Sequence, residues 1–129
     1  MKMVVMLIFV WINTNFNQTG GDLISNISNN FQSGNIKEIA AHFSNTVSLT
    51  LLANENVYSK VQAEIILSNF FKNHHPRTAK IIHRLDNNPN YQHAVIVLET
   101  TNGLFRIAYS LRSQNGVLKI TEIRIEKAP

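Results

Sequence analysis

Apolar and polar residues follow a helical period over residues 59–74, the stretch around which we expect the domain to be organised. Ser59 followed by Gln62 has the spacing of a capping box, in which the two side chains satisfy backbone N–H groups at the start of a helix. Pro76 has no N–H donor and disfavours helical angles at the residue before it, so the helix should end by about His74. The pattern therefore predicts one long helix that begins at Ser59.

Apolar residues occupy two sides of this predicted helix. One broad stripe has i, i+3, i+4, i+7 spacing and should face the sheet; it contains Ala63, Ile66, Leu67, Phe70 and Phe71. Val61 and Ile65 lie on nearly the opposite side, where a second helix or a partner subunit would cover them. We expect Phe70 and Phe71 to pack in the core rather than to hold a ligand.

The residues before this helix predict two short helices and a strand. Asp22 is suited to cap a first helix over residues 22–32. Ser33-Gly34-Asn35 breaks the period, and a second helix should follow, because the helical spacing restarts at Ile36, Ile39, Ala40 and Phe43. Residues 47–52 alternate as a first strand, which a turn links to a brief return strand at Val57-Tyr58.

After Pro76 the apolar residues alternate with period two, which predicts four antiparallel strands. The expected strands are residues 80–85, 92–101, 104–112 and 117–126. Asn102-Gly103 has the composition of a two-residue type I′ hairpin loop, which sets a register. On the core face, that register pairs Thr100 with Phe105, Leu98 with Ile107, Ile96 with Tyr109 and Ala94 with Leu111. On the other face, which should be partly wet, it pairs Glu99 with Arg106, Val97 with Ala108, Val95 with Ser110 and His93 with Arg112.

The strand after the predicted Asn115-Gly116 hairpin contains a fault in its alternation. Ile120 is in phase with the core, whereas Ile123 and Ile125 are out of phase by one residue. A one-residue β-bulge near Thr121-Glu122 would return both isoleucines to the core side and bend the sheet. The sequence therefore predicts a bulge at this point.

The same bulge would bring Arg124 beside Arg106 and Glu99 on the other face, with Glu126 nearby. Such a cluster is either a set of solvated cross-strand pairs, each worth no more than about 1 kcal/mol, or the rim of an interface. An interface would consist of Val95, Val97, Glu99, Arg106, Ala108 and Arg124. We expect a homodimer formed through this face.

The first 21 residues have the composition of a secretory signal. Lys2 precedes an unbroken apolar run over residues 3–12, which is too short to span a bilayer; a retained anchor or a mis-assigned start is the alternative. We therefore assign residues 1–21 to a signal peptide and residues 22–129 to a single domain. The chain has no cysteine, which excludes disulfides and Cys-based metal or nucleophilic sites. An exported chain without disulfides fits the bacterial periplasm or exterior, with no membrane span in the mature chain.

Charge argues against nucleic acid as a partner. The formal net charge of +4 becomes 4 − 1 = +3 without Lys2, and lysines and arginines are scattered singly. The only tryptophan, Trp11, lies in the leader, so stacking platforms are scarce. His74 and His75 are adjacent, cannot both face one ion from a regular element and lack nearby acids, so we expect no metal and no cofactor.

The order of elements, two helices, a strand, a long helix and a bent antiparallel meander, is similar to the α+β cone of the nuclear-transport-factor-2-like, or cystatin-like, fold. Particular strings resemble a family of small exported bacterial proteins known only as a domain of unknown function. They are Gly34-Asn35, Ala40-Ala41-His42-Phe43, Val57-Tyr58-Ser59-Lys60, Gln62-Ala63-Glu64, the run from Thr101 to Arg106 and the run from Glu122 to Lys127. The resemblance covers about residues 22–127 and implies the cone fold and an extracytoplasmic setting, but no activity, since such cones host enzymes, carriers and assembly modules.

A cone of this kind has an open end between helices and sheet, where a ligand would bind. The candidate ligand-binding residues are Tyr58, His83, Tyr109 and His42, with a small apolar molecule as the ligand. Each has a structural alternative: Tyr109 can pack with its hydroxyl satisfied, and His83 can face solvent. The side of the sheet that residues 80–85 present is ambiguous, because Ile81 and Ile82 are both apolar. Another exported protein is a further candidate partner.

An isomerase or dehydratase is the alternative function. It would need a carboxylate or histidine base in an apolar pocket, with a donor to stabilise an enolate. The only aspartates are Asp22, at a helix start, and Asp86, in a predicted loop, which leaves a pairing of His83 with Tyr109 or Tyr58. We assign no catalytic residue and expect a non-catalytic binding module.

Overall fold

The computed structural model describes residues 22–129, so the predicted leader lies outside the described residues. Helices α1 (Leu23–Ser33) and α2 (Ile36–Ala40) precede strands β1 (Phe43–Leu51) and β2 (Asn54–Ser59). Helix α3 (Lys60–Asn73) then leads into β3 (Pro76–Asn88), β4 (Tyr91–Thr100), β5 (Gly103–Gln114) and β6 (Val117–Lys127). The predicted α+β architecture and the order of its elements are confirmed.

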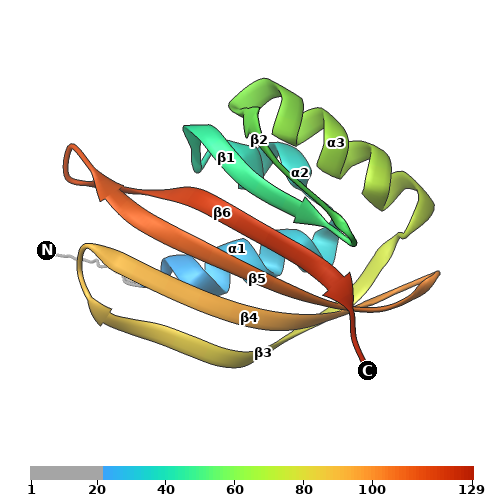
Figure 1. The fold of residues 1–129 in the computed structure, drawn as a ribbon. Coiled ribbons are helices and arrows are strands. Elements are labelled where there is room, and N and C mark those ends of the chain that lie inside the picture. The colour runs from blue at the N-terminus through green and yellow to red at the C-terminus, as the bar shows by residue number, and fades with distance from the viewer. Residues whose placement is uncertain (1–21) are drawn as a thin grey trace, which may run out of the picture.

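The strands of residues 22–129 form one six-stranded sheet in the order β2-β1-β6-β5-β4-β3. All neighbours are antiparallel except β1 and β6, which are parallel. Helix α1 lies across β3 and β4, and α3 packs on β1 and β2, so the helices cover one face of a curved sheet (Figure 1). The other face of the sheet carries no helix (Figure 1).

Helix α3 begins and ends where the sequence predicts. The Ser59 hydroxyl accepts a hydrogen bond from the Gln62 N–H at 3.2 Å and itself donates to the Gln62 side-chain oxygen at 3.4 Å, so one half of the predicted capping box forms. The predicted stripe faces the core, with Ile66 at its margin. Val61 and Ile65 are 66% and 55% exposed, so no other described part of the chain supplies the second neighbour that we predicted.

The second helix is shorter than predicted. Helix α2 ends at Ala40, and Phe43, which we placed on its apolar stripe, begins β1 and pairs with Ile120. Phe43 is buried in either conformation, so its apolar character alone could not separate the two. The prediction that His42 lies on a helix is therefore wrong: this residue occupies the turn between α2 and β1.

The β5–β6 hairpin follows the prediction. Asn115 and Gly116 have φ of 54° and 81°, which are the positive values that a type I′ turn needs at both positions. The register shifts between Ser110 and Leu111, whose partners are Glu122 and Ile120, so Thr121 is the extra residue. The predicted bulge is confirmed.

The β4–β5 register differs from the prediction by two residues. Thr100 pairs with Gly103, so the loop is Thr101-Asn102 rather than Asn102-Gly103. The Thr100 hydroxyl donates to the Gly103 carbonyl at 2.8 Å and accepts from the Asn102 N–H at 3.1 Å, which stabilises this loop. A shift by two leaves every side chain on its predicted face, but the pairs change. They are Leu98 with Phe105, Ile96 with Ile107, Ala94 with Tyr109 and Gln92 with Leu111 on the core side.

The space between helices and sheet is filled by apolar side chains. The largest fully buried one, Tyr109, lies 5.9 Å from Phe31 between ring centroids, and Phe31 lies 6.1 Å from Phe71. The buried apolar residues of the described chain form one cluster that joins both helical regions to the sheet. The interior of the cone is thus a packed core.

Candidate functional site

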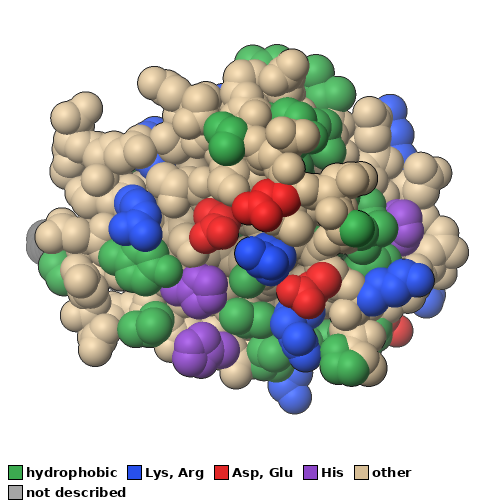
Figure 2. Space-filling view, viewed as in Figure 1, with side chains coloured by type: hydrophobic (Ala, Val, Ile, Leu, Met, Phe, Trp, Pro, Cys, Tyr) green, Lys and Arg blue, Asp and Glu red, His purple; other side chains and the backbone are tan. Residues whose placement is uncertain are grey.

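The face of the sheet without helices is the candidate functional site, and we call it the open sheet face. Its central rows are set by the strand register and consist of Lys80, His83, His93, Val95, Val97, Glu99, Arg106, Ala108, Ser110, Glu122, Arg124 and Glu126. All six predicted interface residues belong to it. Figure 2 shows acidic, basic, histidine and apolar side chains interspersed over this face.

Small apolar side chains lie at the centre of the open sheet face. Val95 pairs with Ala108, and Val97 follows on the same side of β4. All three are partly buried by their neighbours even in the single chain, whereas the alternate residues of the same strands are fully buried on the helix side. The centre is therefore apolar and still accessible.

Charged side chains surround this centre, and the residues that they oppose on neighbouring strands differ from those in the predicted register. Arg106 opposes Glu126, and Arg124 opposes Ala108 on one side and Thr50 on the other. Glu99 opposes Leu104 rather than Arg106, so the predicted pairing of Glu99 with Arg106 is wrong. The Thr78 hydroxyl donates to the Glu99 carboxylate at 3.0 Å instead.

None of these charged groups forms an ion pair within residues 22–129, where the observed ion pairs all involve Arg84. Opposite charges on adjacent strands lie close enough to attract each other, but each pair contributes little while it stays hydrated. The charges of the open sheet face therefore keep most of their capacity to bind a partner.

Two histidines add hydrogen-bonding groups to one side of the open sheet face. The rings of His83 on β3 and His93 on β4 are 6.4 Å apart between centroids, and His93 Nδ1 lies 2.9 Å from the Ser110 hydroxyl. Ser110 is only 3% exposed, so its hydroxyl is held by the histidine and is closed to a substrate. The His93–Ser110 contact could not be predicted from the sequence, because the predicted register was wrong by two residues and placed Arg112 opposite His93.

His83 lies on the open sheet face and not in the cone. A bulge between Ile81 and His83 makes Ile82 the extra residue, so Ile81 faces the core and His83 pairs with Val95 on the other side. This irregularity explains why the alternation of residues 80–85 was ambiguous. It also separates His83 from the helices.

Tyr109 is a core residue whose hydroxyl is satisfied. The hydroxyl donates to the backbone carbonyl of Ile24 on α1 at 2.7 Å, and burial raises the pKa of the phenol far above its usual range. The phenol therefore stays protonated near neutral pH, and its proton is already used in the bond to Ile24. Because Tyr109 and His83 lie on opposite sides of the sheet, the structure does not bring this predicted pair together.

Tyr58 and His42 lie apart from each other and from Tyr109. Tyr58 lines a shallow hollow of about 170 Å³ with Gln62, Ile65 and Ile66, on the outer side of α3. The backbone carbonyl of His42 accepts a hydrogen bond from the Ile120 N–H at 2.7 Å, and burial lowers the pKa of its imidazole. The four residues predicted to line one cavity therefore occupy four separate places.

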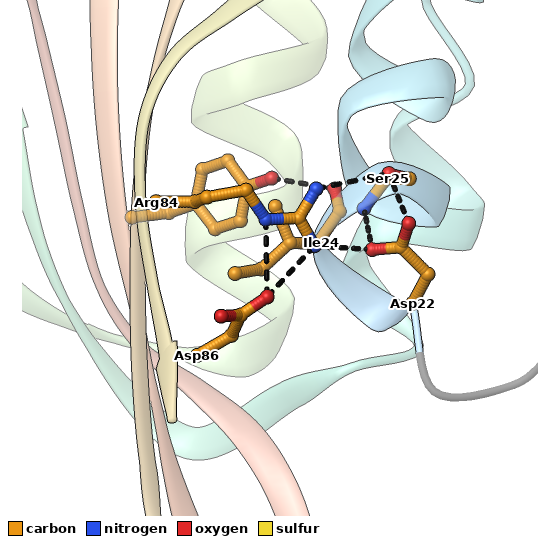
Figure 3. Close-up of polar contacts among 6 residues, drawn as sticks. Asp22, Ile24, Ser25, Arg84 and Asp86 are labelled. Carbon is orange, nitrogen blue, oxygen red and sulfur yellow. Dashed lines mark hydrogen bonds and ion pairs between the residues drawn. The ribbon is translucent and has the colours of Figure 1, made fainter. Parts of the chain in front are cut away.

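Arg84 forms a polar cluster that the sequence did not reveal (Figure 3). Its guanidinium contacts the Asp22 carboxylate at 2.5 Å and the Asp86 carboxylate at 3.0 Å, and so joins β3 to the start of α1. Hydrogen bonds from Ser25 and then from Arg84 lower the pKa of Asp22, which also caps α1. Asp86 lies on β3 and not in a loop as predicted, because that strand continues to Asn88.

No group of three or more histidine, aspartate or glutamate side chains within residues 22–129 is placed to hold a metal ion. No helix in the same range combines the length and the apolarity needed to cross a bilayer.

Comparison with protein families decides the relationship of the chain. Residues 24–126 match the family described as a domain of unknown function, DUF4783. The chain belongs to this family. The predicted resemblance to a domain of unknown function is thereby confirmed, and among curated proteins the comparison finds no match.

Solved structures confirm the fold of this DUF4783 chain. A DUF4783 family protein from Bacteroides uniformis has a TM-score of 0.79 at 24% identity, covering 84% of this chain and 99% of the other. A second, from Bacteroides ovatus, has a TM-score of 0.79 at 22% identity, with 85% and 99% covered. An uncharacterized protein with a cystatin-like fold from Caulobacter vibrioides has a TM-score of 0.63 at 12% identity, with 83% and 85% covered. The cystatin-like, nuclear-transport-factor-2-like fold is therefore shown, and it carries no activity by itself.

Proposed function

We propose that this chain is a non-catalytic interaction module whose open sheet face binds a second copy of the chain. The observation that carries the proposal is the accessible apolar centre of Val95, Val97 and Ala108, on a sheet whose other face is fully covered. An apolar centre with a polar, charged rim is the usual anatomy of a protein interface.

The charges around this centre suit a second copy as the partner. In a two-fold symmetric dimer the same patch meets itself, so a face that binds its own copy needs both signs of charge. Arg106 and Arg124 supply the positive groups, and Glu99 and Glu126 supply the negative ones. Each is free of ion pairs within residues 22–129 and can pair across the interface.

An interface is favoured over a ligand in the cone because the cone is filled. Tyr109 and Phe31 occupy the space between α1 and the sheet, and the Tyr109 hydroxyl is already bonded to Ile24. The same packing argues against the isomerase or dehydratase alternative, since His83 lies across the sheet from Tyr109. Binding therefore has to use the outer surface of the domain.

Sedimentation velocity on the domain of residues 22–129 tests the proposal. The expected result is a dimer for the unchanged chain and a monomer for Val97→Arg, because each copy would bury an uncompensated guanidinium. Val61→Arg is the matched control: it makes the same change at an exposed position on α3 and should leave the dimer intact.

Two outcomes would contradict this assignment. A monomer for the unchanged chain at all concentrations would contradict the proposed homodimer. A dimer that survives Val97→Arg and dissociates with Val61→Arg would move the interface to the outer side of α3. Circular dichroism of both variants shows that the fold itself is retained.

A further inference from the structure

A hollow between the helices lies apart from the open sheet face. It has a volume of about 420 Å³ and opens between the chain segment 33–37, which joins α1 to α2, and one side of α3. His75 and Pro76, at the start of β3, form its third wall. This volume lies within the range of small-molecule sites in proteins.

Backbone geometry holds the hollow open at the end of α1. Gly34 ends this helix with φ of 71° and ψ of 22°, a left-handed conformation that favours glycine. Its N–H and that of Asn35 bond back to the last turn of α1, at Phe31 and Asn30. The chain therefore turns sharply toward α3, and Asn35 then caps α2 by accepting from the Glu38 N–H at 3.3 Å.

Apolar groups form the floor of the hollow and charged groups form its rim. Phe71 and Ile36 are 4% and 6% exposed and belong to the core, so the floor is fixed. Lys37 on α2 and Lys72 on α3 stand on opposite walls, and Glu64 lies two turns before Lys72 on the same side of α3. Within residues 22–129 none of these three charged groups forms an ion pair or a side-chain hydrogen bond.

We propose that this hollow binds a small organic carboxylate with an apolar body. Its carboxylate lies between the Lys37 and Lys72 ammonium groups, and its apolar body covers Phe71. Lys37 and Lys72 outweigh Glu64 by one positive charge, which a single carboxylate neutralises. Inorganic phosphate has no apolar body to cover Phe71 and would have to give up its hydration, so it should bind more weakly than such a carboxylate.

A titration followed by two-dimensional ¹H–¹⁵N NMR tests the site, with phenylacetate as the probe. The expected result is a saturable shift of the amide signals of residues 33–37 and 68–72. At the same concentrations 2-phenylethanol, which has the same ring without the charge, should bind several-fold more weakly. Inorganic phosphate should give no saturable shift there.

Charge variants sharpen the test, because they predict changes of opposite sign. Lys37→Gln and Lys72→Gln should each weaken phenylacetate binding about threefold, whereas Glu64→Gln should strengthen it by a similar factor, as expected for partly exposed ion pairs. Lys127→Gln is the matched control, since this lysine is the last residue of β6 and belongs neither to the hollow nor to the open sheet face. Dispersed amide spectra show that each variant is folded.

Several results would overturn the proposal: equal binding of phenylacetate and 2-phenylethanol, shifts confined to other surfaces, or variants of Lys37 and Lys72 that behave like Lys127→Gln. If phosphate bound as tightly as phenylacetate, the hollow would be a general anion site, and the proposal that it recognises an apolar body would be wrong. The Val97→Arg variant separates this site from the dimer, because the hollow lies within one chain and should bind the probe unchanged.

Discussion

The two faces of the sheet use alternate residues of the same strands for different purposes. On the helix side, Ile96, Ile107 and Ile123 are fully buried, and the Tyr109 hydroxyl has its hydrogen-bond partner. On the open sheet face, Val97 and Ala108 stay partly accessible, and charged neighbours have no ion pairs within residues 22–129. One strand thus carries stability on one side and capacity for recognition on the other, so single substitutions should separate the two.

Ile123→Asp should have the largest effect, because it places a carboxylate on the buried side of β6. Ile123 is fully buried, so the charged group would lose its water without gaining a partner. We expect a loss of more than about 4 kcal/mol in the free energy of unfolding, measured by urea denaturation. Arg124→Asp makes a similar change on the open sheet face of the same strand and should change the stability of a monomeric sample by less than about 1 kcal/mol. Equal losses would show that both sides of β6 are buried alike.

Truncation of one side chain on each face of β4 and β5 should lower the free energy of unfolding by very different amounts. Ile107→Ala leaves a cavity in the core and should cost about 2–5 kcal/mol of unfolding free energy. Val97→Ala, on the open sheet face, should cost less than about 1 kcal/mol in a monomeric sample. Chemical denaturation at low protein concentration measures both. Equal losses would mean that the open face is as tightly packed as the core.

Removal of one hydroxyl should have a smaller effect that still depends on the face. Tyr109→Phe removes the hydrogen bond from the phenol to the Ile24 carbonyl, and should cost about 0.5–1.5 kcal/mol. Tyr91→Phe is the control, because the ring of Tyr91 holds the Arg112 guanidinium 4.7 Å from its centroid and no hydrogen bond of its hydroxyl is seen in the described chain. Thermal unfolding should therefore show a clear drop for Tyr109→Phe and almost none for Tyr91→Phe.

The pH dependence of His42 should give the smallest effect. Burial lowers the pKa of His42 in the folded state below its ordinary value of 6.5. The unfolded chain therefore binds the proton first as the pH falls, so this residue's contribution to stability is present above about pH 6.5 and declines below it. In His42→Gln the free energy of unfolding should fall less between pH 7 and pH 5 than in the unchanged chain. Identical slopes would show that His42 titrates normally in the folded protein.

The sequence was sufficient to place most elements and the faces of β4, β5 and β6, because burial repeats with a fixed period in each. It failed at the end of α2 and at the irregularity of β3. The break between Ile120 and Ile123 located the bulge, and Ser59 located the start of α3. The β4–β5 register was not accessible in the same way. A shift by two residues keeps every side chain on its face, so the contacts of the loop decide the register. They include the hydrogen bonds of Thr100 within the loop and those between Thr101 and His75.

The candidate site was predicted in part for a related reason. The residues of the open sheet face follow from alternation alone, and Val95, Val97 and Ala108 were placed correctly. The positions of the predicted cone residues depend on how the elements pack in three dimensions, which the sequence pattern does not show. The bulge at Ile82 turns His83 outward, and the Tyr109 hydroxyl donates a hydrogen bond to the Ile24 carbonyl. The hollow at Gly34 is formed by segments that are far apart in the sequence, so no local sequence pattern predicts it.

The position of β6 has a consequence for how the domain is made. This strand comes last along the domain, yet it lies inside the sheet between β1 and β5. The β1–β2 hairpin and the β3–β5 meander can each form during synthesis, but they share no strand pairing until β6 has left the ribosome and inserted between them. Closure of the sheet is therefore a late, long-range event, and such events slow folding. The newly made chain consequently passes through an open period in which both half-sheets expose unpaired inner edges to chaperones and to other unfolded chains.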